Sequence, residues 1–529
     1  MLTYYVIAPI LIAVFLYFFS AKVGKIIAIV AQSLIVLGAF YLLYQTHASG
    51  SIVTNVGNFR SFLGVSLMAD TLAAVFVLLS AIIFLAAAIF SINDKHSNLF
   101  WFLLFIWQSA LMGLFLTRDF FNIFVMAEVA TVVVAVLLMY DRSNRRIYDG
   151  MIFLMTNVVA VQFYLFGVGY IYMITGRLDM QAVAEVIATL PPAQVYLAYA
   201  LVMTAVVFKC ALLPLSSWFV KVSTVPRAPV AIATILSALH VKGGIYLFVR
   251  VQGVFGELIP SEFYVVLGII TGIVGVIMAL AQKDILLMLA YSSVAQIGLI
   301  MIALNMGVVY AYVGGLSHTV NHAFFKAGLF FGAGMIAQAY KTRDISKISG
   351  IWQSGRSGKI ITVAQFLAIF GIIGVPFFNG SISKYFMATE AGAPLTAAMI
   401  IINLGTILVY LKYSTMFRGN AQSTKLTTDS VKQIVVLALG VLCLAFGIFG
   451  EVIKNLFFDF ELSVSFWGYT EKILIFVASL CAGLLITRYG RPAMARLENI
   501  GIRFNFGFRG ICATIGGFFG LILVVALLI

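Results

Sequence analysis

The chain has 529 residues, of which 63% are hydrophobic and 10% are charged, and its mean hydropathy is +1.09. A soluble protein of this size keeps a polar exterior, so this composition excludes a soluble globular protein and indicates an all-α polytopic membrane protein. The formal net charge of +14 invites a nucleic-acid-binding interpretation, but the distribution of the basic residues favours another explanation.

Apolar segments long enough to cross about 30 Å of hydrocarbon recur along the whole chain. They predict about sixteen transmembrane spans, separated by turn signals. The first span has neither the basic start nor the cleavage site of a secretory signal, so we expect it to be retained. The predicted spans are residues 2–20, 26–44, 67–92, 98–116, 120–140, 150–174, 194–215, 228–250, 262–281, 285–305, 308–338, 360–388, 394–416, 432–452, 471–488 and 510–529.

When the loops between these spans are assigned alternately to the two sides of the membrane, lysine and arginine gather on one side. Lys22, Arg145 and Arg356 lie on this basic side, whereas Arg118 and Lys454 belong to the few on the other side. The positive-inside rule places the basic loops in the cytoplasm and both termini outside. We therefore expect a multi-pass protein of the cell membrane, embedded in the lipid bilayer. We expect no nucleic acid among its partners.

The four cysteines are far apart in the sequence and form no CxxC pair, so they predict neither a disulfide framework nor an iron–sulfur site. No GxxxxGK[ST] run or other nucleotide-binding motif occurs, which leaves ATP-driven transport without support. We expect no cofactor, no metal and no catalytic redox chemistry in this chain, although it can be a subunit of an ion-translocating oxidoreductase.

Two predicted spans, the seventh and the twelfth, combine a proline with a lysine. Lys209 precedes Pro214 in "FKCALLPLSSWF", and Lys384 follows Pro376 in "GVPFFNGSISKYF". Proline removes a backbone hydrogen bond and frees a carbonyl, which a membrane helix tolerates where other helices or water satisfy it. We predict that both spans are broken. Their separation by five spans favours internal repeats with discontinuous helices around a pathway at the membrane midplane.

Titratable side chains inside the predicted spans are the candidate functional residues. An ionised group at the bilayer centre costs on the order of several kcal/mol, so such groups must face one another or water. We call them the intramembrane set, and its members are Glu128, Lys209, Lys242, His318, His322, Lys326 and Lys384.

Glu128 is the one acidic residue well inside a predicted span, so we expect a lysine, in particular Lys209, as its partner. Pairing in a low dielectric holds a lysine charged, whereas a lysine without its partner can lose its proton. A lysine that is alternately paired and unpaired is a proton-loading site. The alternative is a static buried ion pair that fixes helix packing.

The stretch "LSHTVNHAFFKAGLFF" places His318, His322 and Lys326 four residues apart, which predicts one column on one helix face. Histidines titrate near neutral pH and can bridge one lysine to the next. Zinc, haem and purely structural histidines are the alternatives, but no carboxylate or thiol lies in this span to complete a zinc site. His240, two residues before Lys242, faces another direction and is a secondary candidate.

Seven motifs stand in a characteristic order: "TRDFFNIFVMAEV", "FKCALLPLSSW", "LHVKGGIYLFVR", "KDILLMLAYSSVAQIGLI", "LSHTVNHAFFKAGLFFGAGMI", "TRDISKISGI" and "GVPFFNGSISKYF". Together they make residues 65–420 resemble the antiporter-like, proton-translocating subunits shared by Mrp-type Na⁺/H⁺ antiporters, respiratory complex I and membrane-bound hydrogenases. Lys384 and "VKGGIYLFVR" look closest to the Mrp D-type subunit.

The resemblance implies a 14-helix core with two inverted five-helix repeats, broken helices 7 and 12, and about two extra C-terminal helices. Glu128 matches the family's fifth-helix glutamate, Lys209 its partner on helix 7, and Lys242 the eighth-helix lysine. The column in the stretch above matches the relay on helix 11, and Lys384 the residue on helix 12. The implied regions are residues 1–97 (helices 1–3), 98–255 (first repeat, helices 4–8), 256–420 (second repeat, helices 9–13) and 421–529 (helices 14–16).

The chain departs from the family pattern at two places outside the intramembrane set. Ser216 and Ser217 stand where the family commonly has histidine or an aromatic residue after the proline of helix 7. Leu286 and Leu287 replace a basic pair before helix 10. The first change puts the cytoplasmic access route of the family in question, and the second removes charge near helix 10.

The function implied by the resemblance is a proton-translocating membrane subunit of a multi-subunit cation/proton antiporter. The alternative is the same kind of subunit in a redox-driven complex, such as a membrane-bound hydrogenase or a complex I-type oxidoreductase. A haem-bearing membrane anchor and a structural scaffold are the other classes left open. Expected partners are other membrane subunits and H⁺, with Na⁺ as a second candidate ion.

Overall fold

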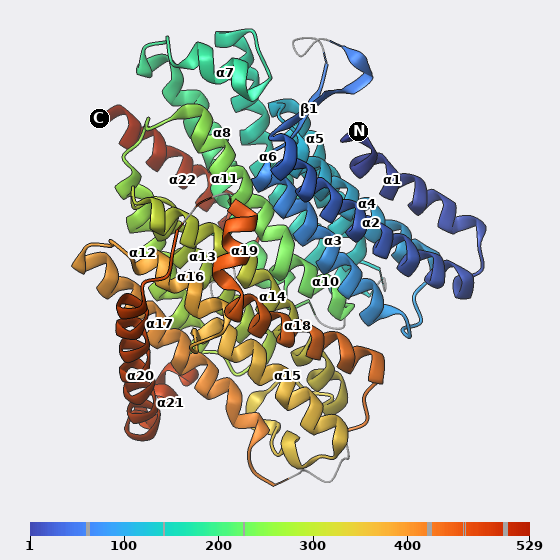
Figure 1. Cartoon of the computed structure of the whole chain (residues 1–529), viewed down its shortest axis with the longest axis vertical. Coiled ribbons are helices and arrows are strands. Elements are labelled where there is room, and N and C mark those ends of the chain that lie inside the picture. The colour runs from blue at the N-terminus through green and yellow to red at the C-terminus, as the bar shows by residue number, and fades with distance from the viewer. Residues whose placement is uncertain are drawn as a thin grey trace. The chain divides into compact units, whose positions relative to one another are not determined.

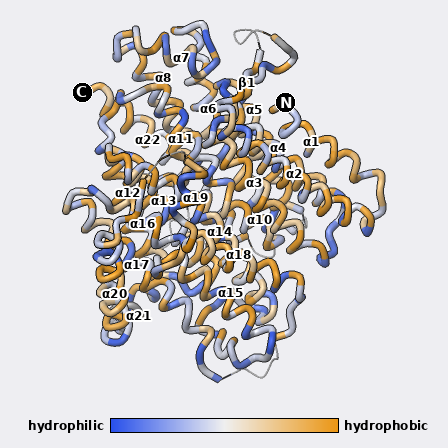
Figure 2. The backbone as a smooth tube through the Cα atoms, viewed as in Figure 1, coloured by the Kyte–Doolittle hydropathy of each residue, from blue (hydrophilic) through white to orange (hydrophobic). Residues whose placement is uncertain are grey.

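The computed structural model describes residues 1–59, 64–140, 143–225, 228–420, 426–458, 460, 462–500 and 506–528. The described chain is almost entirely helical, and its two strands, β1 (Ile52–Asn55) and β2 (Ser66–Ala69), form an antiparallel hairpin (Figure 1). Most helices are hydrophobic along most of their length, and hydrophilic residues gather in the connections (Figure 2). The predicted all-α polytopic membrane protein is confirmed.

The chain divides into two compact units, each described by itself. Unit 1 comprises Met1–Ile235, Leu239–Pro260 and Phe506–Ile529, and unit 2 comprises Leu236–Ala238 and Ser261–Asn505. The helices of unit 1 are α1 (Thr3–Phe15), η1 (Leu16–Phe18), α2 (Ala21–Ser49), η2 (Val56–Asn58), α3 (Thr71–Ser91), α4 (Asn98–Leu116), α5 (Phe120–Leu138), α6 (Asn144–Thr175), α7 (Met180–Ile187), α8 (Pro192–Lys209), α9 (Ser217–Val222), α10 (Val230–Ile235), α11 (Val241–Phe255) and α22 (Phe508–Leu528).

Unit 2 contains the second long run of membrane helices and the segment that follows them. Its helices are α12 (Ser261–Leu280), α13 (Ile285–Leu304), α14 (Val309–Tyr340), η4 (Ile345–Lys347), η5 (Ile351–Gln353), α15 (Arg356–Ile373), α16 (Asn379–Ala388), α17 (Ala393–Tyr413), η6 (Ser414–Phe417), α18 (Ser430–Ile448), α19 (Gly450–Phe458), α20 (Phe466–Tyr489) and α21 (Arg491–Ile500). The short helix η3 (Leu236–His240) begins in unit 2 and ends in unit 1.

Helices coincide with all the predicted spans. The described part of the chain contains 14 helices long and apolar enough to cross a membrane. The two remaining predicted spans are a shorter apolar helix at Thr3–Phe18 and the 32-residue α14. At about 1.5 Å per residue, α14 is longer than a crossing of about 30 Å requires. Its polar column, rather than its length, distinguishes it from the other spans.

Both predicted helix breaks are present. In unit 1, α8 ends at Lys209 and α9 begins at Ser217, with Pro214 between them. Ala211 adopts a left-handed conformation (φ 56°) in this break. The indole Nε1 of Trp218 donates a hydrogen bond to the Phe208 carbonyl (2.8 Å), so a carbonyl at the end of α8 gains a side-chain donor.

In unit 2, α15 ends at Ile373 and α16 begins at Asn379, with Pro376 between them. Gly374 has a φ of 85°, which glycine adopts without steric cost. The two half-helices approach so closely that a Cβ on Gly380 would collide with the backbone carbonyl of Gly371. Glycine is therefore required at position 380, so the geometry of this break depends on Gly380 as well as on Pro376.

A third irregularity was not predicted. The helix that carries Lys242 runs from α10 into α11 through η3, a five-residue π-turn at Leu236–His240. The hydroxyls of Ser237 and Ser293 lie 2.9 Å apart within unit 2. Within the turn, Leu236–Ala238 belong to unit 2, and the residues on either side of these three belong to unit 1.

An isolated β-bridge joins two helix starts in unit 1, at Asp119 and Asp179. Across it, the Phe120 amide donates to the Leu178 carbonyl (2.9 Å). Each aspartate also accepts hydrogen bonds from the first turn of the helix that it precedes, which satisfies amides that have no partner within the helix. The bridge therefore fixes the start of α5 beside the start of α7.

Unit 2 contains the same arrangement at Asp284 and Asp344. Both partners recur 165 residues later in the chain, from 119 to 284 and from 179 to 344. Here the two aspartates cap α13 and η4. This recurrence is what an internal repeat would produce, while the inverted relation of the repeats and the region boundaries stay predictions.

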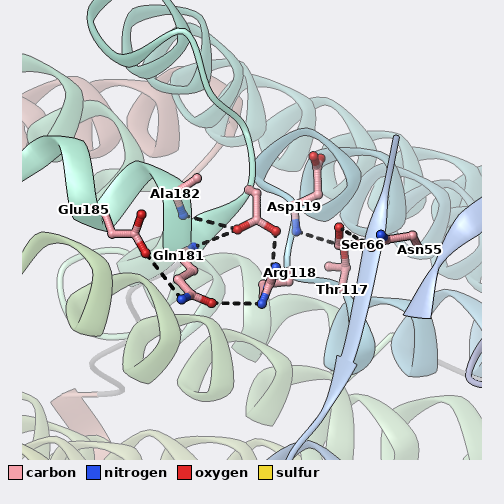
Figure 3. Close-up of polar contacts among 9 residues, drawn as sticks. Asn55, Ser66, Thr117, Arg118, Asp119, Gln181, Ala182 and Glu185 are labelled. Carbon is pink, nitrogen blue, oxygen red and sulfur yellow. Dashed lines mark hydrogen bonds and ion pairs between the residues drawn. The ribbon is translucent and has the colours of Figure 1, made fainter. Parts of the chain in front are cut away.

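Arg118 strengthens the bridge in unit 1. Its Nε donates to Asp179 Oδ2 (2.8 Å). Its Nη1 donates to Gln181 Oε1 (3.1 Å), as Figure 3 shows. Asp179 Oδ1 accepts hydrogen bonds from the backbone amides of Gln181 and Ala182. Because the Asp179 side chain is only 7% exposed, its charge depends on these donors.

We expect Arg118→Gln to destabilise the protein by about 1–3 kcal/mol, because a nearly buried carboxylate loses its cationic partner. The matched control is Lys347→Gln, since Lys347 lies 3.8 Å from Asp344 but its side chain is 71% exposed. An exposed pair of this kind contributes about 0–1 kcal/mol. Thermal unfolding of the purified variants measures both effects, and equal losses would contradict the role given to Arg118.

Candidate functional site

Lys209 is the last residue of α8, at the edge of the helix break. Its side chain is buried, and Nζ donates hydrogen bonds to Thr131 Oγ1 on α5 (3.0 Å) and Asn157 Oδ1 on α6 (2.9 Å). Both acceptors are neutral. The end of α8 therefore places an amine among uncharged oxygens, where it keeps hydrogen bonds whether or not it is protonated.

Glu128 lies on α5 near Lys209, and the two side chains attract each other electrostatically. The predicted ion pair is nevertheless open, because among the described residues Lys209 contacts Thr131 and Asn157 rather than Glu128. One carboxylate oxygen of Glu128 is buried and has no hydrogen-bond partner in the described part of the chain. The structure thus holds the two residues as neighbours and not as a closed pair.

Lys242 is fully buried near the start of α11, two residues after the π-turn. Gly244 allows α11 to approach the end of α8, since a Cβ there would lie 2.6 Å from the Cys210 amide nitrogen. The sequence "KGG" therefore brings the backbone beside Lys242 against the backbone beside Lys209. The contact requires glycine and would not accept alanine.

His240 lies among aromatic rings. Its Nδ1 accepts a hydrogen bond from Trp107 Nε1 (3.3 Å), and its ring centroid lies 6.4 Å from that of Trp218. An accepting Nδ1 fixes the tautomer of the neutral ring, with the proton on Nε2. This environment favours a structural role for His240.

The predicted column lies on α14, and His318, His322 and Lys326 are all fully buried. The ring centroids of His318 and His322 are 6.4 Å apart, and the ring of His322 packs edge-on against Phe325 at 5.3 Å. The four-residue spacing has therefore placed three buried polar side chains in succession along α14.

His318 connects three neighbouring helices. One ring nitrogen lies 2.9 Å from Ser383 Oγ on α16, and the other lies 3.0 Å from Gln296 Oε1 on α13. Gln296 in turn donates to Thr406 Oγ1 on α17 (3.0 Å). A change in the protonation of His318 must reverse at least one of these hydrogen bonds, which couples its charge to the packing of α13 and α16.

Lys326 ends the column and contacts α13 and α17. Its Nζ donates to the Leu289 carbonyl (2.9 Å), to Ser292 Oγ (2.7 Å) and to Tyr410 Oη (3.2 Å). All three acceptors are neutral oxygens. The two hydroxyls also lie 2.9 Å from each other, so Lys326 belongs to a hydroxyl network in which either partner can donate.

Lys384 lies on α16, just after the second break. Its Nζ donates to the Ile372 carbonyl (2.6 Å) and to Asn403 Oδ1 on α17 (2.6 Å). Ile372 stands four residues before Pro376, and proline has no N–H to donate to that carbonyl. The lysine therefore satisfies the carbonyl that the proline frees. A pocket of about 90 Å³ adjoins this lysine.

The two break-associated lysines have similar partners in the two units. Lys209 donates to the side-chain oxygen of Asn157, and Lys384 donates to that of Asn403. Sequence reasoning singled out the charged residues and missed these asparagines. The available signal was a single carboxamide in an apolar span. Burying a carboxamide without a hydrogen-bond partner is costly, so its presence indicates a polar partner nearby.

No grouping of three or more His, Cys, Asp and Glu side chains that could hold a metal ion occurs in the described ranges. The side-chain hydrogen-bond partners described above for Lys209, Lys326, Lys384 and His318 are hydroxyls and carboxamides. Amines, imidazoles and hydroxyls hydrogen-bonded in this way can hold and transfer protons.

Comparison with known proteins gives a consistent result. Residues 117–412 match the protein family described as "NADH:quinone oxidoreductase/Mrp antiporter, TM". The N subunit of the NADH-quinone oxidoreductase of Desulforudis audaxviator is 32% identical over 367 residues, which cover 66% of this chain and 71% of that protein. The D subunit of the Na(+)/H(+) antiporter of Alkalihalophilus pseudofirmus is 26% identical over 396 residues, which cover 73% of this chain and 79% of that protein.

Two solved structures share the fold. A chain of the membrane-bound sulfane sulfur reductase, an archaeal respiratory membrane complex, matches with a TM-score of 0.79 at 23% identity, over 91% of this chain and 99% of that one. A chain of the Mrp complex from Dietzia sp. DQ12-45-1b matches with a TM-score of 0.79 at 21% identity, over 90% and 99%.

We expect Asn157→Leu to lower the stability by about 1–3 kcal/mol, because Lys209 loses one of its two acceptors while it stays buried. Adding Lys209→Met removes the buried amine, so the double variant should recover most of the loss. Thermal unfolding of the single and double variants measures this coupling. A double variant less stable than Asn157→Leu would contradict the contact.

Proposed function

The chain belongs to the NADH:quinone oxidoreductase/Mrp antiporter transmembrane family, and on that premise we propose that it is a proton-translocating subunit of a multi-subunit cation/proton antiporter, most like the Mrp D-type subunit. One observation carries the proposal. Among the described residues, Lys209 and Lys384 donate to neutral oxygens only, and Lys326 donates to three neutral oxygens.

This arrangement suits a lysine that must both bind and release a proton. A buried lysine paired with a carboxylate is held charged, because losing the proton would leave an unpaired anion. A lysine among hydroxyls, carbonyls and carboxamides leaves no such anion, and the neutral amine still has two N–H groups for the same acceptors. The cost of changing its charge is therefore smaller.

Loading begins in unit 1. When the Glu128 carboxylate closes on Lys209, it favours the charged amine; when the pair is open, the low dielectric favours release. The open geometry supports this cycle, because the carboxylate lies close enough to attract Lys209 and has an unsatisfied oxygen. Lys242, on the helix packed against the end of α8, is the next acceptor.

Unit 2 carries the later steps. The proton passes along the α14 column, where His318 joins Gln296 and Ser383. Ser383 precedes Lys384 in α16, so the hydroxyl that contacts His318 and the lysine lie on adjacent residues of one helix. Lys384 then exchanges its proton on the side with few basic loops, which the positive-inside rule makes the outside of the cell membrane.

The second candidate is the same relay in a redox-driven membrane complex. The 32% identity with a subunit of an NADH-quinone oxidoreductase favours it, since the D-type antiporter relative is 26% identical. Purification of the native complex separates the two functions. Associated iron–sulfur or nickel–iron subunits would support the redox-driven pump, whereas sodium-dependent proton exchange without an electron donor would support the antiporter.

We expect Lys209→Ala and Glu128→Ala each to lower proton transport by at least about tenfold, because each removes one partner of the loading step. The measurement is proton flux in proteoliposomes that contain the assembled complex, with assembly checked by size-exclusion chromatography. Lys347→Ala is the control, because its exposed side chain lies outside the relay. Near-normal flux in both test variants would rule out this mechanism.

A further inference from the structure

The segment formed by the helices α19 and α20 packs against the half-helix α16 within unit 2. The Ser465 amide donates to Tyr385 Oη (3.0 Å), and the Phe377 amide donates to Tyr469 Oη (3.2 Å). The hydroxyl of Tyr469 also lies 3.0 Å from Ser381 Oγ. The helix that carries Lys384 is therefore packed against a segment to which the relay assigns no role.

Lys454 is the unexpected member of this segment. The loop assignment placed it at the membrane surface, yet it lies on α19 and is only 2% exposed. Its Nζ donates to the Leu462 carbonyl and lies 4.8 Å from the ring centroid of Phe386 on α16. No ion pair holds Lys454 within the described residues. Glu451 attracts Lys454 electrostatically, as Glu128 attracts Lys209, so the surroundings of Lys454 resemble those of Lys209.

A small cavity lies between Lys454 and the relay helix. It measures about 20 Å³ and is lined by Ser317 and Asn321 of α14, Ile382 of α16 and Lys454 of α19. A water molecule needs a space of about 10–15 Å³ and two or more polar partners. Polar groups from α14 and α19 meet here, so the cavity is suited to hold water.

The hydroxyl of Ser317 is a second observation that favours water in the cavity. Its residue is 9% exposed, and its Oγ is buried without a hydrogen-bond partner among the described residues. An unsatisfied hydroxyl in an apolar bundle is costly, and a water molecule in the cavity would remove that cost. Such a water would share the cavity with the side chain of Lys454, which also lines it.

The cavity adjoins the α14–α16 contact that carries His318. Asn321, on the cavity wall, donates to the Asn379 carbonyl (2.9 Å), and Ser383 donates to the same carbonyl (3.2 Å). Ser383 is the hydroxyl that contacts His318. The cavity and the relay thus share one backbone group of α16.

We propose that Lys454 is a second outer proton-exchange group of unit 2, reached from the α14–α16 contact through water in this cavity. In each cycle the cavity water receives one proton from the α14 relay and passes one to the neutral Nζ, which then releases one proton to the outer aqueous phase. The water is unchanged at the end, and only N–H and O–H bonds form and break. The Leu462 carbonyl accepts a hydrogen bond from the amine in either protonation state, whereas the Phe386 ring favours the charged state. The inference rests on the proton-transport function proposed above.

The test compares two replacements of Lys454 in the assembled complex. Lys454→Met removes the exchangeable proton and should lower proton flux in proteoliposomes by about three- to tenfold. Lys454→Arg keeps a cation for the Leu462 carbonyl and the Phe386 ring, but a guanidinium does not release its proton. It should retain the wild-type melting temperature and still show the reduced flux.

A matched pair at Ser317 tests the water separately. Ser317→Val and Ser317→Thr add the same bulk to the cavity and differ in the hydroxyl, so the valine variant should transport several-fold more slowly than the threonine variant. Wild-type flux in Lys454→Arg, or equal flux in the Ser317 pair, would overturn the proposal. Lys209→Ala is measured in parallel, because normal flux there would refute the transport function itself rather than the role of Lys454.

Discussion

The hydrogen bond between Lys384 and the carbonyl of Ile372 shows the constraint on which the rest of the site depends. Within a bilayer, a backbone carbonyl without a partner is too costly to leave, and Pro376 removes the amide that would have satisfied this one. The side chain that replaces the amide is titratable. The helix break and the buried cation therefore require each other, since each supplies the group that the other lacks.

Two of the described contacts show how the partners of a basic side chain differ with its position in the structure. At the helix starts, Arg118 faces the carboxylate of Asp179, where a permanent charge pair fixes geometry. Inside the membrane spans, Lys326 faces a carbonyl and two hydroxyls, which tolerate either protonation state. In these two examples the charged acceptor lies at a helix start, and the neutral acceptors lie inside the membrane spans.

Much of the fold could be predicted from the sequence, because the length of an apolar segment and the position of a proline determine the structure of that segment itself. The breaks at Pro214 and Pro376 and the burial of the α14 column followed from these signals. The acceptors Asn157 and Asn403 could not be assigned to their lysines, because contacts between distant spans depend on packing. Lys454 was placed in a loop for a related reason, since a nine-residue helix leaves no length signal.

The π-turn before Lys242 bears on the phase of that helix. A π-turn contains one residue more than an α-turn, so every side chain after it is rotated by about 100° relative to an uninterrupted helix. The direction in which Lys242 faces is therefore set by a single extra residue at Leu236–His240. If the π-turn moved along the helix to a position beyond Lys242, the lysine side chain would rotate by about 100° and meet different neighbours.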